Sequence, residues 1–244
     1  MTTPDKKVEN LAANGAGDNA DFIAILASAI HDMKNSLGFV LNSLDEFIDE
    51  ANEAQSPERL VRVQYEAKRV NNNLVRLLAL YKMQCLGVSA NVDEHDVGDF
   101  LEECMLQDKP ITDAKGIKVG IDCFEGLMGY FDDDLMMGVL GNAVTNAIRY
   151  TQNELIITAE EIDGYLKISV NDDGTGFPES MLSSGESESS GAGHGVSFSS
   201  GNTGLGLYFS SLVAALHKNK GRTGYIDFSN GNALSGGCFS IYLP

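Results

Sequence analysis

The chain has 244 residues, of which 43% are hydrophobic, and a formal net charge of -18 at pH 7. This length suits one or two domains with proper cores. The acidic balance argues against a nucleic-acid partner, which would need clustered lysine and arginine. Four scattered cysteines without a CxxC pair argue against a zinc site or a disulfide framework. With no signal core and no apolar run near the ~20 residues of a membrane helix, the sequence predicts a soluble, cytoplasmic protein.

The first part of the chain is predicted to be helical after a short tail. Residues 1–20 are small and polar, which indicates disorder. Apolar residues then recur every three or four positions over 22–48, as in an amphipathic helix. After Ser56, a possible cap, Pro57 suits the first position of a second helix, whose apolar stripe is Leu60, Val63, Ala67, Val70, Leu74, Leu77 and Tyr81. Residues 21–86 should therefore form an all-α hairpin, which a second copy would complete as a dimeric four-helix bundle.

A polar linker (87–95) precedes a region of mixed pattern, and we expect residues 96–244 to fold as an α/β two-layer sandwich. Asp163-Gly164 joins two alternating strands and is a strong hairpin signal. A stretch of low complexity, 183–202, has no capacity to build a core. The expected helices are 96–108, 133–151 and 204–221, and the expected strands are 116–124, 154–172 (as the hairpin), 224–230 and 236–244.

Two glycine-containing stretches in this region could bind a ligand. In VNDDGTGFP (170–178), a strand runs into a carboxylate pair and two glycines, which would let a ligand approach the backbone; an ordinary β-turn is the alternative. In GNTGLGLYFSSLV (201–213), three glycines open an apolar-periodic helix. This arrangement offers N–H groups and the positive helix end to an anion, normally phosphate; a linker ending in a helix cap is the alternative.

A third stretch, GNAVTNAIRYT (141–151), places polar groups on one side of a helix. Asn142 and Asn146 lie one turn apart and share a face, with Arg149 and Tyr150 close behind. Asparagine can ligate Mg²⁺, arginine can neutralise phosphate, and tyrosine can stack on a base. The alternative is a helix whose polar face merely meets water.

Together these stretches resemble the N box (141–151), G1 box (170–178) and G2 box (201–213) of the histidine protein kinases, whose ATP-binding domain belongs to the Bergerat-fold superfamily. GGCFSIYLP (236–244) is similar to the closing strand of that domain, and HDMKNSL (31–37) to the H box on the dimerisation helix. The five elements occur in family order over residues 21–244. The resemblance implies a helical hairpin followed by a Bergerat-type ATP-binding domain.

The resemblance also implies roles for matching residues, with ATP and Mg²⁺ as cofactors. Asp172 would accept a hydrogen bond from the adenine amino group. Asn146 would ligate Mg²⁺, with Asn142 supporting the phosphates or metal waters. Further nucleotide contacts would come from Arg149, Tyr150, Gly174, Gly176, Gly201, Thr203, Gly204, Leu205 and Gly206. Gyrase-type relatives carry a water-activating glutamate where this chain has Asn142, which cannot act as a base at neutral pH, so hydrolysis is disfavoured.

By the same resemblance, His31 would be the phosphoacceptor. A neutral imidazole offers a free ring nitrogen near pH 7, and Asp32 is suited to accept a proton from the other nitrogen. Asn35, one turn on, could orient a water against a phosphorylated receiver, as in relatives with phosphatase activity. Without the downstream boxes, a His-Asp pair on a bundle helix would be read as inert. Ser36 stands where the H box commonly has proline, which puts any helix bend there in doubt.

The implied protein is a homodimer that phosphorylates itself and passes phosphate to a response-regulator receiver domain. Because a sensor domain is not apparent ahead of the H box, the signal is expected from a separate sensor protein. Two alternatives stay open at this point. One is a dimeric histidine phosphotransfer relay with a vestigial ATP domain, for which the atypical serine- and glycine-rich lid is weak support. The other is a Bergerat-type protein-serine kinase, which would not need His31.

Overall fold

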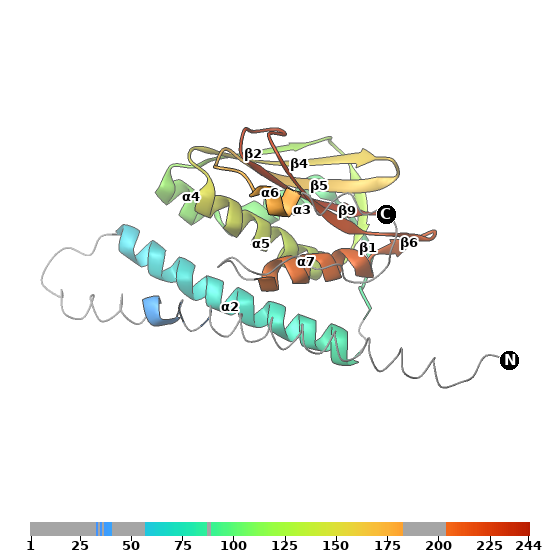
Figure 1. Cartoon of the computed structure of the whole chain (residues 1–244), viewed down its shortest axis with the longest axis horizontal. Helices are drawn as coiled ribbons and strands as arrows, with labels where there is room; N and C mark the ends of the chain where they lie inside the picture. Colours follow the sequence, from blue (N-terminus) through green and yellow to red (C-terminus); the bar gives the residue numbers. More distant parts are fainter. Residues whose placement is uncertain (1–32, 34, 36, 41–56, 87–88, 183–203) are drawn as a thin grey trace, which may run out of the picture.

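The structure is a computed structural model that describes residues 33, 35, 37–40, 57–86, 89–182 and 204–244 (Figure 1). Of the first expected helix, 22–48, only Met33, Asn35, Leu37 and the residues up to Val40 are described, and all are helical. The rest of that helix, and with it the four-helix bundle, lies outside the described residues.

The second expected helix is present as α2 (Pro57–Leu86). It begins at the proline, whose fixed φ and missing N–H suit a first turn. Its expected apolar stripe does not all turn inward, since Leu74 and Tyr81 are each about half exposed, at 50% and 51%. The side chains that α2 buries include Arg76 and Leu80, and the helix contacts α4 and α7 of the α/β domain (Figure 1).

A five-stranded sheet with helices on one face confirms the expected sandwich (Figure 1). The strand order is β2-β4-β5-β9-β8; β2 runs parallel to β4, and the other neighbours are antiparallel. The strands are β2 (Lys118–Cys123), β4 (Glu154–Ile162), β5 (Tyr165–Asp172), β8 (Tyr225–Asn230) and β9 (Gly237–Leu243). The helices against the sheet are α3 (Val97–Leu106), α5 (Asp133–Tyr150) and α7 (Gly204–Leu216).

The hydrophobic core lies between the sheet and these helices. It takes one face of each central strand, with Ile157, Ile168 and Ile241 fully buried, because side chains alternate between the two faces of a sheet. From the helices, Leu140 of α5 and Leu205 of α7 are fully buried on the same side. Burial of this apolar area, at about 25 cal/mol per Å², is the main force holding the two layers together.

The Asp163-Gly164 hairpin forms as the sequence predicts. Both residues have positive φ, 51° and 74°, and Ile162 pairs with Tyr165 across the turn. Positive φ at both central positions defines the type I′ turn, whose twist matches the flanking strands. The turn therefore fixes the register that brings Asp172 to the end of β5, beside Leu155 of β4.

The last residues of the expected linker, 87–95, belong to a strand. Strand β1 (Asp93–Asp96) begins inside that range and pairs antiparallel with β3 (Met128–Phe131). His95, expected to be a linker residue, stacks its ring on Phe131 at a centroid distance of 4.8 Å. The charged sequence DEHD gives no apolar alternation, so this ribbon had no sequence signal. Four more short elements were not predicted: α4 (Lys109–Lys115), α6 (Glu179–Leu182), β6 (Lys218–Asn219) and β7 (Arg222–Thr223).

None of the helices within the described ranges has the length and apolar character needed to cross a membrane.

Candidate nucleotide-binding site

Asp172 is a buried carboxylate at the end of β5, with 6% of its surface exposed. Its Oδ1 accepts hydrogen bonds from the backbone N–H groups of Gly174, at 2.8 Å, and Gly237, at 3.2 Å. Its backbone carbonyl accepts from the N–H of Gly236 at 2.9 Å. Both of these hydrogen bonds to the carboxylate end on Oδ1, so the side chain is oriented with Oδ2 able to accept from a ligand.

Gly174 brings the loop after β5 against the end of α5. A Cβ at this glycine would lie 2.5 Å from the carbonyl oxygen of Tyr150, which real side chains essentially never do. The adjacent Asp173 has a structural role, because it accepts from the N–H groups of Gln152, at 2.8 Å, and Asn153, at 2.9 Å. Burial acts to raise the pKa of Asp173, but these hydrogen bonds outweigh it and lower that pKa. The two neighbouring carboxylates therefore make different contacts. Asp172 keeps Oδ2 available to a ligand, and Asp173 fixes the loop after α5.

Asn230, at the end of β8, holds the other side of this loop and was missed in the sequence. Its Oδ1 accepts from the N–H of Phe177 at 2.8 Å, and its Nδ2 donates to the carbonyl of the same residue at 3.0 Å. Gly176 has φ 77° and lies so close to the Asn230 amide that a Cβ would come within 2.8 Å of it. The Phe177 ring packs edge-on against Phe228, with centroids 5.1 Å apart.

Replacing Asn230 by alanine should loosen this loop without unfolding the domain. Two hydrogen bonds to Phe177 are lost, but water can reach the freed groups, so we expect a loss of about 1 kcal/mol in the free energy of unfolding. Nucleotide affinity should fall about three- to tenfold because the loop is no longer held. Urea unfolding and a titration with a fluorescent ATP analogue measure the two effects. The control is Asn232→Ala, which removes a bond to the Ser229 hydroxyl only; an equal loss of affinity in both variants would contradict this role.

Asn142 and Gly206 bring α5 and the start of α7 into contact. Asn142 is 6% exposed, and a Cβ at Gly206 would lie 2.3 Å from its Oδ1. Leu205 is fully buried beside this contact, and the Ser210 hydroxyl donates to the carbonyl of Gly206 at 2.9 Å. Gly204 is the first residue of α7. The close approach thus joins two of the stretches that the sequence singled out.

Three further residues of the 141–151 stretch lie on the exposed side of α5. Asn146, Arg149 and Tyr150 are all exposed. The Arg149 guanidinium carbon lies 5.8 Å from the centroid of the Tyr150 ring, a cation–π distance. An amide, a guanidinium and an aromatic ring are therefore accessible to solvent within one and a half turns.

Four expected site residues lie outside the described residues: His31, Asp32, Gly201 and Thr203. Asn35 is described, and it is helical and exposed. The structure therefore describes most of the residues expected to contact the nucleotide, and the roles of all expected site residues stay predictions.

His217 directly follows α7, as expected for a helix-end residue, but it is 2% exposed and has a structural role that the sequence did not show. Its Nε2 accepts from the N–H of Asp132 at 3.0 Å, so the ring proton is assigned to Nδ1, which donates to the carbonyl of Val213 at 2.8 Å. Asp132 in turn caps α5 by accepting from the N–H of Leu135. The C-terminal end of α7 is therefore fixed to the N-terminal end of α5.

Known proteins share both the sequence and the fold of this region. Residues 131–244 match the family described as histidine kinase-, DNA gyrase B-, and HSP90-like ATPase. Over 168 residues the chain is 27% identical to sensor protein SrrB of Staphylococcus aureus, covering 66% of this chain and 28% of that protein. The chain thus spans less than a third of the length of the curated relatives it matches.

Two solved structures have the same fold at low identity. The Acinetobacter baumannii histidine kinase AdeS has a TM-score of 0.60 and 18% identity, covering 87% of this chain and 96% of that one. The catalytic domain of histidine kinase ThkA in a nucleotide-free form has a TM-score of 0.50 and 22% identity, covering 63% and 95%. Residues 131–244 of this chain therefore match the histidine kinase-, DNA gyrase B- and HSP90-like ATPase family, and the chain shows sequence homology to sensor histidine kinases.

Proposed function

We propose that this chain is a protein-histidine kinase that phosphorylates itself on His31 with ATP and passes the phosphoryl group to an aspartate of a response-regulator receiver. The observation that carries the proposal is the way α5 is held at two points. Gly174 of the loop after β5 touches Tyr150 at its C-terminal end, and Gly206 of α7 touches Asn142 in its middle. Three sequence stretches far apart in the chain thus line one site.

The residues fit a purine nucleotide. Asp172 is held by the N–H groups of Gly174 and Gly237, so its second oxygen would accept from the adenine amino group, with Tyr150 beside the base. Glycine at 176 allows the positive φ that the loop beside this site adopts. Asn142 and Asp172 are both buried, so their side chains would be held in place for the ligand.

The exposed part of α5 and the start of α7 suit the phosphate end. Asn146 would hold Mg²⁺, with Asn142 supporting it, and Arg149 would neutralise phosphate charge. The metal ion would neutralise charge on the transferred phosphoryl group. The start of α7 would offer backbone N–H groups and the positive helix end to the phosphates, with glycine-rich residues Gly201, Thr203, Gly204, Leu205 and Gly206 around it.

His31 would attack with its free ring nitrogen, and Asp32 would accept the proton of the other nitrogen. Asn142 carries no titratable group, so it cannot activate water, which favours transfer over hydrolysis. Asn35 is exposed on its helix, where its amide would orient water against a phosphorylated receiver. Phosphatase activity and a separate sensor protein stay predictions.

A homodimer is part of this proposal. On α2, four large apolar side chains recur at spacings of one, three and three and are 50–58% exposed in the single chain: Leu74, Val75, Leu78 and Tyr81. A helix in water gains by covering such a stripe. A second copy paired along residues 21–86, the dimerisation and phosphotransfer hairpin, would cover it as a four-helix bundle. We propose that this dimer is cytoplasmic.

The histidine assignment is tested by incubating the chain with γ-labelled ATP. We expect a label that survives base and is lost in acid, and that His31→Gln abolishes it, because imidazole is then absent at the acceptor position. His95→Gln, which removes a histidine packed on Phe131, should keep the label. Acid-stable label in the His31→Gln variant would instead support the protein-serine kinase, and failure of the chain to bind nucleotide would support the relay module with its vestigial ATP domain.

A further inference from the structure

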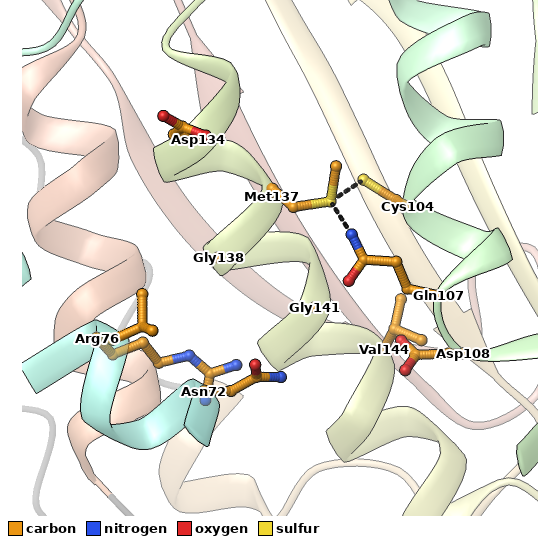
Figure 2. A pocket seen from close by; sticks show the side chains of 11 residues that line it. Asn72, Arg76, Cys104, Gln107, Asp108, Asp134, Met137, Gly138, Gly141 and Val144 are labelled. Carbon is orange, nitrogen blue, oxygen red and sulfur yellow. Dashed lines mark hydrogen bonds between the residues drawn. The ribbon is translucent and has the colours of Figure 1, made fainter. Parts of the chain in front are cut away.

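A groove of about 150 Å³ lies between α2 and the helices α3 and α5 (Figure 2). None of its lining residues is among those expected to contact the nucleotide, although Gly141 and Val144 belong to the 141–151 stretch. Arg76 and Asn72 come from α2, Cys104 from α3, and Met137 and Gly141 from α5. The groove therefore touches the helical segment and the ATPase domain at the same time.

The groove has open space beside α5 because Gly141 carries no side chain. A Cβ at Gly141 would meet no atom within 4 Å, whereas a Cβ at Gly138, the other glycine of the lining, would lie 3.0 Å from the Phe209 ring of α7. Beside them, Met137 Sδ lies 3.3 Å from Cys104 Sγ and 3.4 Å from Gln107 Nε2, forming one apolar wall with polar edges (Figure 2).

Arg76 lines this groove with a donor that has no partner. The side chain is 7% exposed, and its Nη1 donates to Asn73 Oδ1 at 3.3 Å. Its Nε is buried, and within the described part of the chain it makes no hydrogen bond. Burial lowers the pKa of Arg76 to about 10, against the opposing charge of Asp108, so the guanidinium stays charged at neutral pH. A buried unpaired donor is costly, and it points to an acceptor supplied by a ligand.

The charges around the groove select the kind of ligand. Asp108, also only 7% exposed, lines the groove and balances the charge of Arg76. An added anion would be repelled by Asp108, by Asp134 at the rim and by the overall charge of -18. An added cation would be repelled by the guanidinium of Arg76. A neutral molecule avoids both penalties.

We propose that this groove binds a small neutral carboxamide, whose oxygen accepts from Arg76 Nε and whose N–H groups suit the carboxylate of Asp108. The volume equals that of about five water molecules, enough for a molecule of about that many heavy atoms. The carbon part lies beside Gly141, where no atom fills the space of a side chain. Because the ligand touches α2, α3 and α5 together, its binding strengthens the attachment of α2 to the ATPase domain.

The test uses the ¹⁵N-labelled full chain and the Nε–Hε resonance of Arg76, which is assigned by its absence in Arg76→Lys. Propionamide is titrated beside two isosteres that differ in charge, propionate and propylammonium. We expect a saturable shift of the Arg76 resonance with propionamide, at the millimolar affinity that about five heavy atoms allow, and at least tenfold weaker binding of both charged isosteres.

Two variants check that the shift reports on the groove. Gly141→Leu fills the space next to α5 and should abolish propionamide binding, whereas Gly120→Ala on strand β2, away from the groove, should leave it unchanged. Arg76→Lys, followed through the Gly141 amide resonance, should weaken binding because the Nε donor is gone. No saturable shift with propionamide, equal or tighter binding of propionate, or an unchanged affinity in Gly141→Leu would each overturn the proposal.

Discussion

Replacing Asp172 by asparagine should reduce nucleotide affinity about a hundredfold while leaving the fold intact. The asparagine Oδ1 can still accept from the N–H groups of Gly174 and Gly237, which now bond to Asp172 Oδ1 at 2.8 and 3.2 Å. Its Nδ2, however, takes the place of the oxygen that would face the adenine amino group, so two donors meet. Loss of a charge-assisted hydrogen bond costs about 3 kcal/mol, or about two decades in affinity.

A fluorescent ATP analogue measures this affinity, and Asp173→Asn is the matched control. Asp173 fixes the loop after α5 through Gln152 and Asn153, so its variant should lose stability and keep nucleotide binding. Because the pKa of Asp173 is lowered in the folded protein, its stabilising contribution is present above pH ~4 and disappears as the pH falls through the folded-state pKa. Lost binding in Asp173→Asn with full binding in Asp172→Asn would reverse the two roles.

Replacing each of two helical glycines by alanine should change the free energy of unfolding in opposite directions. In Gly206→Ala, the new methyl group would lie 2.3 Å from Asn142 Oδ1, so the start of α7 must move. Alanine favours a helix over glycine by about 1 kcal/mol, but forced overpacking of this kind costs about 1 to 3 kcal/mol. We therefore expect Gly206→Ala to lower the free energy of unfolding by up to about 2 kcal/mol and to weaken nucleotide binding.

The matched variant is Gly141→Ala, where the methyl group meets nothing within 4 Å. It should raise the free energy of unfolding by up to about 1 kcal/mol, because only the helix preference acts. Urea unfolding measures both variants. Adding Asn142→Ala to Gly206→Ala should recover part of the lost stability, since the two side chains are in contact and their effects do not add. A gain in stability for both glycine variants would contradict the close packing of Asn142 on Gly206.

The sequence predicted the parts of the fold whose signals are local. Helix α5 has a long apolar stripe, and the hairpin at Asp163-Gly164 has a turn that only a few residue pairs favour. On α2, by contrast, the stripe that included Leu74 and Tyr81 is partly exposed, while Arg76 is buried. The buried face of a helix is not always its most apolar face. Which face of α2 is buried depends on where the neighbouring domain lies, and the sequence of the helix alone does not show this.

The candidate site was predictable where residue type alone suggests chemistry, as for Asp172 and Asn142. The division of labour between Asp172 and Asp173 was not, because it depends on which N–H groups each carboxylate meets. Asn230 and His217 were missed for a related reason. Their hydrogen bonds reach across 53 and 85 positions of the chain, to Phe177 and Asp132, so no short window of sequence contains both partners.

The place of β9 in the sheet has a consequence for how the protein is made. This strand pairs with both β5 and β8, and Gly236 and Gly237 at its start bond to Asp172. Until these residues emerge from the ribosome, β8 has no neighbour in the sheet and one hydrogen-bonding edge of β5 stays unpaired. The nascent chain is therefore expected to need protection by chaperones over this interval, and to acquire its nucleotide site only in the last step of folding.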